Sequence, residues 1–193
     1  MGRKQSALKT EILEAASSLF YLNGYANTGI SEIIKKAGTN KTTFYQKYES
    51  KNDLGRKYIL SFYRRILKTL INLMKKSANT EDFLSKWFKF IKKNIQKNIE
   101  FNGCPVANYH GQLKFSDTKE KEFIQRLSKR WLKVITLYLE KEKLKSNLEY
   151  SSKDMAVMFF SVYQGMLISY KLTGDIKVID NSLKLVLSMC KKS

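Results

Sequence analysis

The stretch from Thr28 to Tyr48 constrains the fold more than any other part of the chain. Apolar residues recur at helical spacing in its first half, and Thr28 is the expected N-cap of that helix. Gly38 then favours the left-handed conformation that ends a helix, and Asn40 is suited to cap a second helix. Helices this short are unstable alone and must pack against a third. The stretch is therefore typical of a helix-turn-helix, whose second helix enters the DNA major groove.

The charge of the chain agrees with this interpretation but does not locate the binding surface. The 193 residues carry a formal net charge of +19, which is typical of proteins that bind nucleic acid. The first 60 residues hold ten basic and five acidic side chains, so most of the excess lies elsewhere. Charge therefore supports DNA binding without identifying the residues that contact DNA.

The composition also indicates whether the protein spans a membrane and in which cellular compartment it is found. There is no run of about 18 apolar residues, so no transmembrane span is expected. The N-terminus lacks the apolar segment of a signal peptide. The two cysteines, Cys104 and Cys190, fit reduced thiols better than a disulfide framework. We therefore expect a cytoplasmic protein.

The rest of the chain indicates an all-α fold of about nine helices. It contains one proline, and helical spacing replaces the period-two alternation of strands. Ser50 is expected to cap a long helix over about 51–76, and Thr80 is expected to cap the next one. We predict a DNA-binding domain at 1–50 and an effector-binding and dimerisation domain at 51–193, with the long helix linking them.

Two quoted segments carry a resemblance to a known family. They are I-L-E-A-A-S-S-L-F-Y-L-N-G-Y-A-N-T and I-S-E-I-I-K-K-A-G-T-N-K-T-T-F-Y-Q-K-Y-E-S-K-N-D-L, which together span Ile12 to Leu54. They resemble the N-terminal domain of TetR-family transcriptional regulators. The resemblance implies about nine helices, an Ω-shaped homodimer, operator binding by the third helix, and release by a small molecule bound in the C-terminal domain. Repression is the default in that family, and activation stays open.

The candidate DNA contacts lie in and around the predicted third helix. Lysines are suited to neutralise phosphates, whereas Gln46 can bond adenine and threonine methyls can contact thymine. For each residue the alternative is a solvated surface side chain. The candidates are Thr28, Thr39, Asn40, Lys41, Thr42, Thr43, Tyr45, Gln46, Lys47, Tyr48 and Lys51.

The last two predicted helices are apolar over more than a narrow stripe. Such a hairpin suits a homodimer interface in which two copies form a four-helix bundle. The alternative is that the hairpin only covers other helices of its own chain. The candidate interface residues are Met155, Phe159, Val162, Met166, Tyr170, Ile179, Leu183 and Val186.

Cys104 is the main candidate for a regulatory thiol. It precedes Pro105, which suits the first position of a helix, and a helix N-terminus lowers the pKa of a thiol. The segment from Asn102 to His110 is similar to a Gly-Cys motif in a TetR subgroup that includes regulators answering electrophiles and oxidants. One hypothesis is therefore that Cys104 is a sensing thiol; the alternative, which stays open, is a small buried side chain at a tight corner.

Aromatic and polar side chains along the C-terminal region are candidates for an effector pocket. Apolar cavities with a few polar groups are typical of small-ligand sites, although aromatics at helical spacing also form ordinary cores. The effector itself is not identified. With Cys104, the candidates are Trp87, Phe101, Tyr109, His110, Trp131, Tyr138, Tyr163 and Gln164.

Two rival classes fit less well. A Cys104–His110 pair is conceivable in an enzyme, but no third orienting group, phosphate loop or metal-ligand cluster accompanies it in the sequence. A membrane-surface helical protein would need exposed apolar faces, whereas these faces alternate as packing partners. We expect no enzyme, metal or cofactor; the expected partners are operator DNA, a second copy of the chain and an unidentified small molecule.

Overall fold

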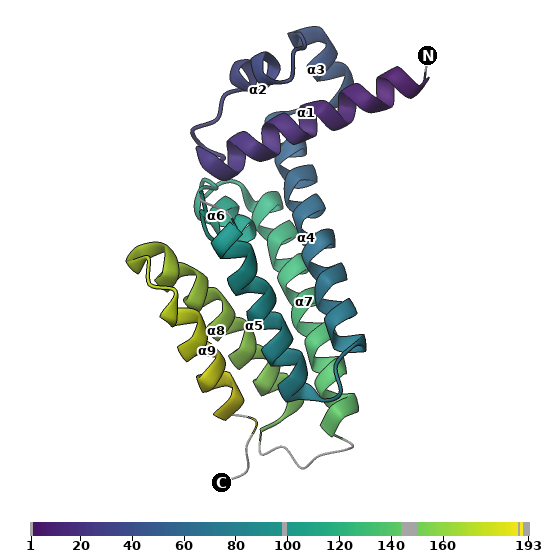
Figure 1. The fold of residues 1–193 in the computed structure, drawn as a ribbon. Helices are drawn as coiled ribbons and strands as arrows, with labels where there is room; N and C mark the ends of the chain where they lie inside the picture. The colour runs from purple at the N-terminus through teal and green to yellow at the C-terminus, as the bar shows by residue number, and fades with distance from the viewer. Residues whose placement is uncertain (1, 98–99, 144–149, 189, 191–193) are drawn as a thin grey trace. The chain divides into compact units, whose positions relative to one another are not determined.

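The computed structural model describes residues 2–97, 100–143, 150–188 and 190, and these residues form an all-helical fold (Figure 1). The elements are α1 (Gly2–Leu22), α2 (Ile30–Lys36), α3 (Lys41–Lys47), α4 (Lys51–Lys75), α5 (Thr80–Lys97), α6 (Pro105–Gly111), α7 (Thr118–Lys143), α8 (Ser152–Thr173) and α9 (Lys177–Ser188). The described residues contain nine helices and no strand, which confirms the predicted fold class. The first helix begins at Gly2.

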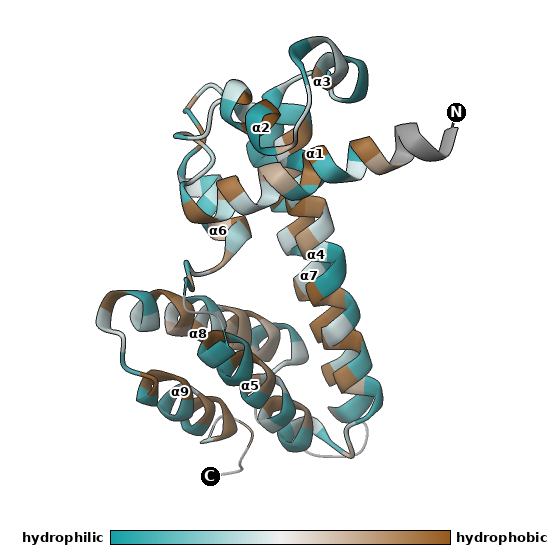
Figure 2. Ribbon diagram, turned by 45° about the horizontal axis from the view of Figure 1, so that its top comes forward, coloured by the Kyte–Doolittle hydropathy of each residue, from teal (hydrophilic) through white to brown (hydrophobic). Residues whose placement is uncertain are grey.

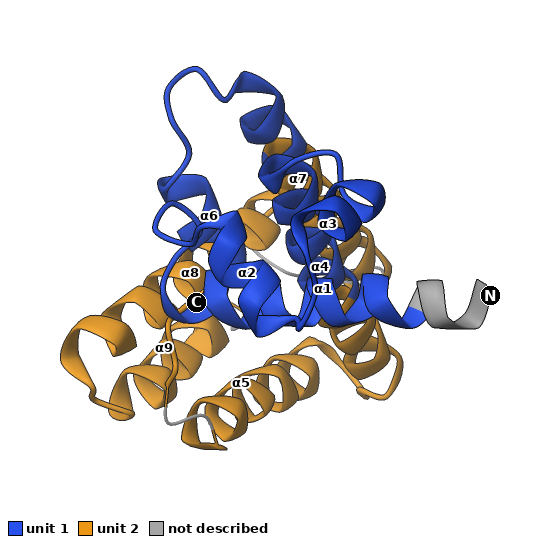
Figure 3. Ribbon diagram, turned by 90° about the horizontal axis from the view of Figure 1, so that it is seen from above, with its two compact units in different colours: residues 1–64, 105–124 blue, residues 65–104, 125–193 orange. Residues whose placement is uncertain are grey.

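The chain divides into two compact units (Figure 3). Unit 1 contains residues 1–64 and 105–124, and unit 2 contains residues 65–104 and 125–193. The boundaries fall inside α4, inside α7 and between Cys104 and Pro105. The predicted boundary between two domains lay between residues 50 and 51. The observed division is different, because α6 and the beginning of α7 pack with the N-terminal helices.

Side-chain caps and glycines set the helix ends of the N-terminal unit. Asn40 Oδ1 accepts a hydrogen bond from Thr43 N at 2.9 Å, as predicted. Gly38 has a φ of +60°, the left-handed conformation that ends α2. The N-cap of α2 is Gly29, so the prediction for Thr28 is wrong. The Thr28 hydroxyl instead donates to Gly24 O at 2.7 Å and is buried.

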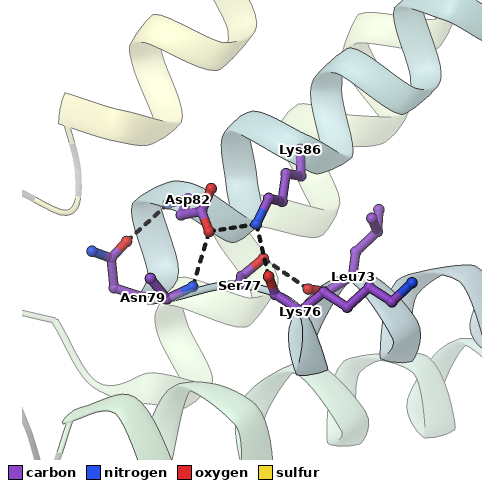
Figure 4. Close-up of polar contacts among 7 residues, drawn as sticks. Leu73, Lys76, Ser77, Asn79, Asp82 and Lys86 are labelled. Atoms are coloured by element: carbon purple, nitrogen blue, oxygen red, sulfur yellow. Dashed lines mark hydrogen bonds and ion pairs between the residues drawn. The ribbon is translucent and has the colours of Figure 1, made fainter.

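Hydrogen bonds fix the corner between α4 and α5 in unit 2 (Figure 4). Asn79 Oδ1 accepts from Asp82 N at 2.9 Å, so Asn79 is the cap and the prediction for Thr80 is wrong. Asp82 Oδ2 accepts from Ala78 N at 2.9 Å, while Lys86 Nζ bridges Asp82 Oδ2 and Lys76 O. The bond from Lys86 lowers the pKa of the Asp82 carboxyl. These contacts hold the end of α4 against the start of α5.

Helices α5 and α9 of unit 2 are amphipathic. Brown apolar and teal polar residues alternate along α5 and α9 in Figure 2, and α9 packs against both α5 and α8. Lys92 Nζ on α5 lies 2.7 Å from Asp180 Oδ2 on α9. By length and composition alone α8 could cross a membrane, whereas the sequence predicted no transmembrane span. Soluble core helices have the same properties, and Met155, Phe159 and Met166 on α8 are buried.

Candidate nucleic-acid interface

The inner side of α3 is fixed by two buried aromatic residues. Phe44 has no exposed surface, and its ring centroid lies 6.1 Å from that of Tyr48. The Tyr48 hydroxyl donates to Lys9 O on α1 at 2.8 Å, and burial raises the pKa of Tyr48 to about 12. Tyr48 was a candidate DNA contact, but the structure uses its side chain to anchor the end of α3 to α1.

The outer side of α3 is a polar ridge. We define the α3 ridge as Lys41, Thr42, Tyr45 and Gln46, all exposed; Tyr45 is 46% exposed. These positions share one face of the helix, opposite Phe44. An α-helix presenting such a face fits the width of the DNA major groove.

The other candidate DNA contacts are less accessible or occupied. Thr28 is buried, and Thr39, Thr43 and Lys47 are half-buried. Asn40 uses its side chain as the cap of α3. Lys51 Nζ donates to Ala26 O at 3.2 Å and lies 4.6 Å from the centroid of the Tyr25 ring. Burial lowers the pKa of Lys51.

A second set of contacts holds α6 and the start of α7 in unit 1. Tyr109 on α6 is buried, with its ring centroid 4.6 Å from that of Tyr25. A Cβ placed on Gly55 of α4 would lie 2.9 Å from atoms of both tyrosine rings. Burial is the main cause of the raised pKa of Tyr109 and of Tyr25, the latter to about 12. The two tyrosines and Gly55 form the close-packed centre of this joint.

Polar contacts flank the same joint. Ala26 N, in the link between α1 and α2, donates to Gln112 Oε1 at 3.0 Å. Arg56 Nη1 on α4 lies 3.1 Å from Glu120 Oε1 on α7, and Glu120 is buried. The Tyr25 hydroxyl donates to Asn52 Oδ1. Sequence reasoning missed these residues. A glycine inside an otherwise regular helix, Gly55, was the available signal of a close approach.

The candidate effector residues fall in both units. Trp87, Trp131 and Tyr163 form an aromatic cluster in unit 2, with Trp131 stacked on Tyr163 at 6.0 Å and Trp87 at 5.7 Å from the same ring. Phe101 packs on Tyr170, and Tyr138 packs on Phe83. Two further candidates, Tyr109 and His110, belong to unit 1, and His110 is exposed.

Cys104 is buried in unit 2, and Gln164 Nε2 lies 3.7 Å from its Sγ. Burial is the main cause of the raised pKa of Tyr163, and an electrostatic interaction with Cys104 is a second cause. Among the described residues no cluster of three or more His, Cys, Asp or Glu side chains is placed to hold a metal ion.

A separate cavity lies among four helices of unit 2, and none of the candidate effector residues lines it. Its enclosed part measures about 20 Å³, and the unfilled space is about 340 Å³ when the open side is included. The lining residues are Thr80, Phe83, Leu84, Ile135, Leu139, Met155, Met158, Phe159, Val186 and Cys190.

The candidate dimer residues mostly face the interior of their own chain. Met155, Phe159, Met166, Ile179 and Val186 are buried, and Val162, Tyr170 and Leu183 are half-buried. A different set of apolar side chains is exposed on the hairpin, namely Val157, Ile168 and Leu172 on α8 and Leu185 on α9. We call this set the hairpin face.

The chain is similar in sequence and in fold to known transcriptional regulators. Residues 12–56 match the sequence model for bacterial regulatory proteins of the tetR family. An uncharacterised HTH-type transcriptional regulator from the lacX 3′ region of Lactococcus lactis is 25% identical over 185 residues, which cover 95% of this chain and 93% of that protein. The HTH-type transcriptional repressor DhaR of a Mycobacterium species is 21% identical over 186 residues, or 94% and 91%. The reduced form of NemR from E. coli has the same fold, with a TM-score of 0.87 at 15% identity over 97% and 98% of the two chains.

The helix-turn-helix and the exposed α3 ridge define a DNA-binding transcriptional regulator. The family match covers residues 12–56, and the L. lactis relative extends the similarity over nearly the whole chain. Residues 12–56 therefore form a DNA-binding domain of the type found in TetR-family transcriptional regulators. The family and its fold are those of regulatory DNA-binding proteins.

The packing at Gly55 leads to a stability prediction. We expect Gly55→Ala to lower the free energy of unfolding by about 1–3 kcal/mol, because the added methyl overlaps the Tyr25 and Tyr109 rings. Gly111→Ala is the control, since a Cβ there meets no atom within 4 Å. Urea unfolding followed by circular dichroism measures both. Equal stability of the two variants would contradict the close packing of this joint.

Proposed function

We propose that the protein is a cytoplasmic homodimeric repressor that binds a two-fold symmetric operator through α3 and leaves it when an effector acts on unit 2. The α3 ridge is the observation that carries the proposal. Its four side chains are exposed on a helix whose opposite side is fixed by Phe44 and Tyr48. Repression is supported by the related DhaR, which is described as a repressor.

The chemistry of the α3 ridge divides its work into positioning and reading. Lys41 is suited to a phosphate, which orients the protein without reading sequence. Gln46 has the paired donor and acceptor that match the major-groove edge of adenine, and the Thr42 methyl suits a thymine methyl. The Tyr45 hydroxyl is suited to bond to the sugar-phosphate backbone of DNA. Base discrimination is therefore assigned to Gln46 and Thr42.

Substitutions on the α3 ridge are expected to separate these roles. Gln46→Ala should weaken operator binding by about 1–3 kcal/mol and leave binding to random DNA unchanged. Lys41→Ala should weaken both and reduce the salt slope by about one unit. Fluorescence anisotropy at several salt concentrations, with the chain's own upstream DNA and a scrambled duplex, measures these effects.

Gln125→Ala is the matched control, because Gln125 is an exposed glutamine outside the helix-turn-helix. It should bind as the parent protein does. If the parent protein binds upstream and scrambled DNA equally, the proposal of a sequence-specific repressor is wrong.

The homodimer is proposed to form through the hairpin face. TetR regulators act as dimers, and half-sites on DNA are read by two-fold symmetric pairs. Ile168 and Leu172 are 51% and 78% exposed, a cost for apolar side chains that a second copy would relieve. The buried residues of the same helices instead hold the hairpin to its own protomer.

A charge on the hairpin face should therefore break the dimer. We expect Ile168→Glu to shift the protein to a monomer at micromolar concentration in analytical ultracentrifugation and to weaken operator binding. Leu137→Glu on α7 is the control, because Leu137 is 54% exposed and lies outside the hairpin. A stable Ile168→Glu dimer, or an equal effect of both variants, would place the interface elsewhere.

The finer part of the proposal is that Cys104 senses thiol-reactive effectors. Cys104 directly precedes α6, which packs within the same unit as α3. Adding a bulky group to this buried thiol would displace Gln164 and pull on the chain where it enters α6. NemR, whose fold is similar, has been solved in a form described as reduced, which supports redox-sensitive chemistry for such a fold.

Treatment with N-ethylmaleimide tests this role. It should weaken operator binding of the parent protein by about tenfold or more, within the usual range of allosteric coupling. Cys104→Ser should bind the operator normally and lose this response. Cys190→Ser is the control and should keep it, since burial raises the pKa of Cys190 to about 11 and keeps that thiol protonated at neutral pH. A response that survives Cys104→Ser would assign sensing to another group.

A further inference from the structure

A long groove runs between α5 and α9 on the surface of unit 2. Its lining residues on α5 begin at Ser85 and end at Gln96, a length of three helical turns or about 16 Å. Ile179, Asp180 and Leu183 line it on α9, and the unfilled space is about 960 Å³ when the open side is included. We call this space the α5–α9 groove. It shares no lining residue with the enclosed cavity described above, and its length suits a peptide segment better than a compact small molecule.

The α5–α9 groove has an apolar floor. Phe88 on α5 and Ile179 on α9 are buried in it, and Leu183 is half-buried. The alkyl stems of the lysines that line the groove add apolar surface, because only the end of a lysine side chain is charged. An apolar side chain of a partner placed against Leu183 and these stems would be removed from water.

The α5–α9 groove is positively charged along its α5 side. Three lysines line it, namely Lys89, Lys92 and Lys93. Among the described residues the lining contains one carboxylate, that of Asp180, which is paired with Lys92. Lys89 and Lys93 are exposed and four positions apart, so both project from the same side of α5. Lys97, which is also exposed, extends this row by another turn, and the row matches carboxylates spaced one helical turn apart.

The combination of charge and apolar surface favours an acidic peptide over DNA. A DNA backbone would pair with the lysines, but it has no apolar side chain to place against Leu183, and Asp180 would repel its phosphates. An acidic amphipathic helix supplies both carboxylates and apolar side chains.

The α5–α9 groove is also separate from the hairpin face. Leu183 lines the groove and Leu185 belongs to the hairpin face. Residues two positions apart on a helix point in directions about 200° apart, so the two surfaces lie on different sides of α9. A second copy of the chain bound at the hairpin face therefore leaves the groove open.

We propose that the α5–α9 groove docks an acidic amphipathic helix of a partner protein. Apolar side chains of that helix lie against Leu183 and the lysine stems, and its carboxylates pair with Lys89 and Lys93. Such docking brings a second protein to the regulator. This role goes beyond operator binding and release, and it requires no effector.

Three labelled peptides of about 16 residues test the docking. The acidic peptide carries leucines at every third or fourth position and glutamates beside that stripe, so it forms an amphipathic helix. A scrambled peptide has the same composition and charge without the stripe, and a neutral peptide has glutamine in place of each glutamate. We expect the full-length protein to bind the acidic peptide at least about tenfold more tightly than either of the others. Fluorescence anisotropy without DNA measures the three affinities.

Paired charge reversals locate the binding site. Lys89→Glu combined with Lys93→Glu should weaken binding of the acidic peptide by about tenfold or more, because like charges then face each other. Lys129→Glu combined with Lys133→Glu is the matched control, since these lysines are exposed and four positions apart on α7, outside the groove. At about 0.15 M salt, where distant charges are screened, the control should bind as the parent protein does. Leu183→Ala should weaken binding of the acidic peptide and leave binding of the scrambled peptide unchanged.

Several results would overturn the inference. They are equal affinities for the acidic and scrambled peptides, equal effects of the two charge reversals, or no saturable binding of the acidic peptide at millimolar concentration. Operator binding is measured on the same samples, and the Lys89 and Lys93 reversal should leave it unchanged. Weaker operator binding by that variant alone would assign the lysine row to DNA and refute the docking proposal. Absence of sequence preference in the parent protein refutes the repressor proposal and leaves the docking proposal intact.

Discussion

Burial of Phe44 is the interaction on which the DNA-binding unit depends. An isolated seven-residue helix such as α3 is unstable in water, because the cost of starting a helix is not recovered over two turns. Phe44 places α3 in the core, the Tyr48 hydroxyl bonds to α1, and Asn40 satisfies the first turn. The α3 ridge is therefore presented by a helix whose position is determined by residues outside the ridge.

Unit 1 contains α3 together with helices from later in the chain. Helix α6 and the start of α7 pack with α1–α4 through Tyr109, Gly55, Gln112 and the Arg56–Glu120 pair. A change that reaches Pro105 through the chain therefore acts on the same compact unit that contains α3. This gives Cys104, the residue before Pro105, a covalent route to the DNA-binding helices in addition to any route along α4 or α7.

Local signals predicted most of the fold, and their limits are physical. Asn40, Ser50 and Gly38 behave as their types indicate, because capping depends on groups within a few residues. Thr28 and Thr80 failed as caps because a neighbouring residue offered another solution; the Thr28 hydroxyl bonds to Gly24 and Asn79 caps α5. The contacts of Gly55 and Gln112 join segments far apart in sequence, so no local pattern specifies them.

The hairpin shows where periodicity stops being informative. Helix α8 is apolar around much of its circumference, so spacing alone does not tell which residues face the core. Met155 and Phe159 were assigned to a dimer interface and are buried in their own protomer, whereas Val157 and Ile168 remain exposed. The aromatic candidates behave similarly, since Trp131 and Tyr163 stack on each other as part of the core.

Because positive charge is spread along the chain, sequence discrimination depends on the α3 ridge. A net charge of +19 spread along the chain favours contact with any DNA phosphate. Such attraction lowers the free energy of specific and non-specific complexes alike, so it adds nothing to discrimination. Specificity must therefore come from the few exposed side chains of α3 and from the spacing of two copies. In the mechanism proposed above, an effector that alters that spacing would release the protein from its operator while leaving its general affinity for DNA in place.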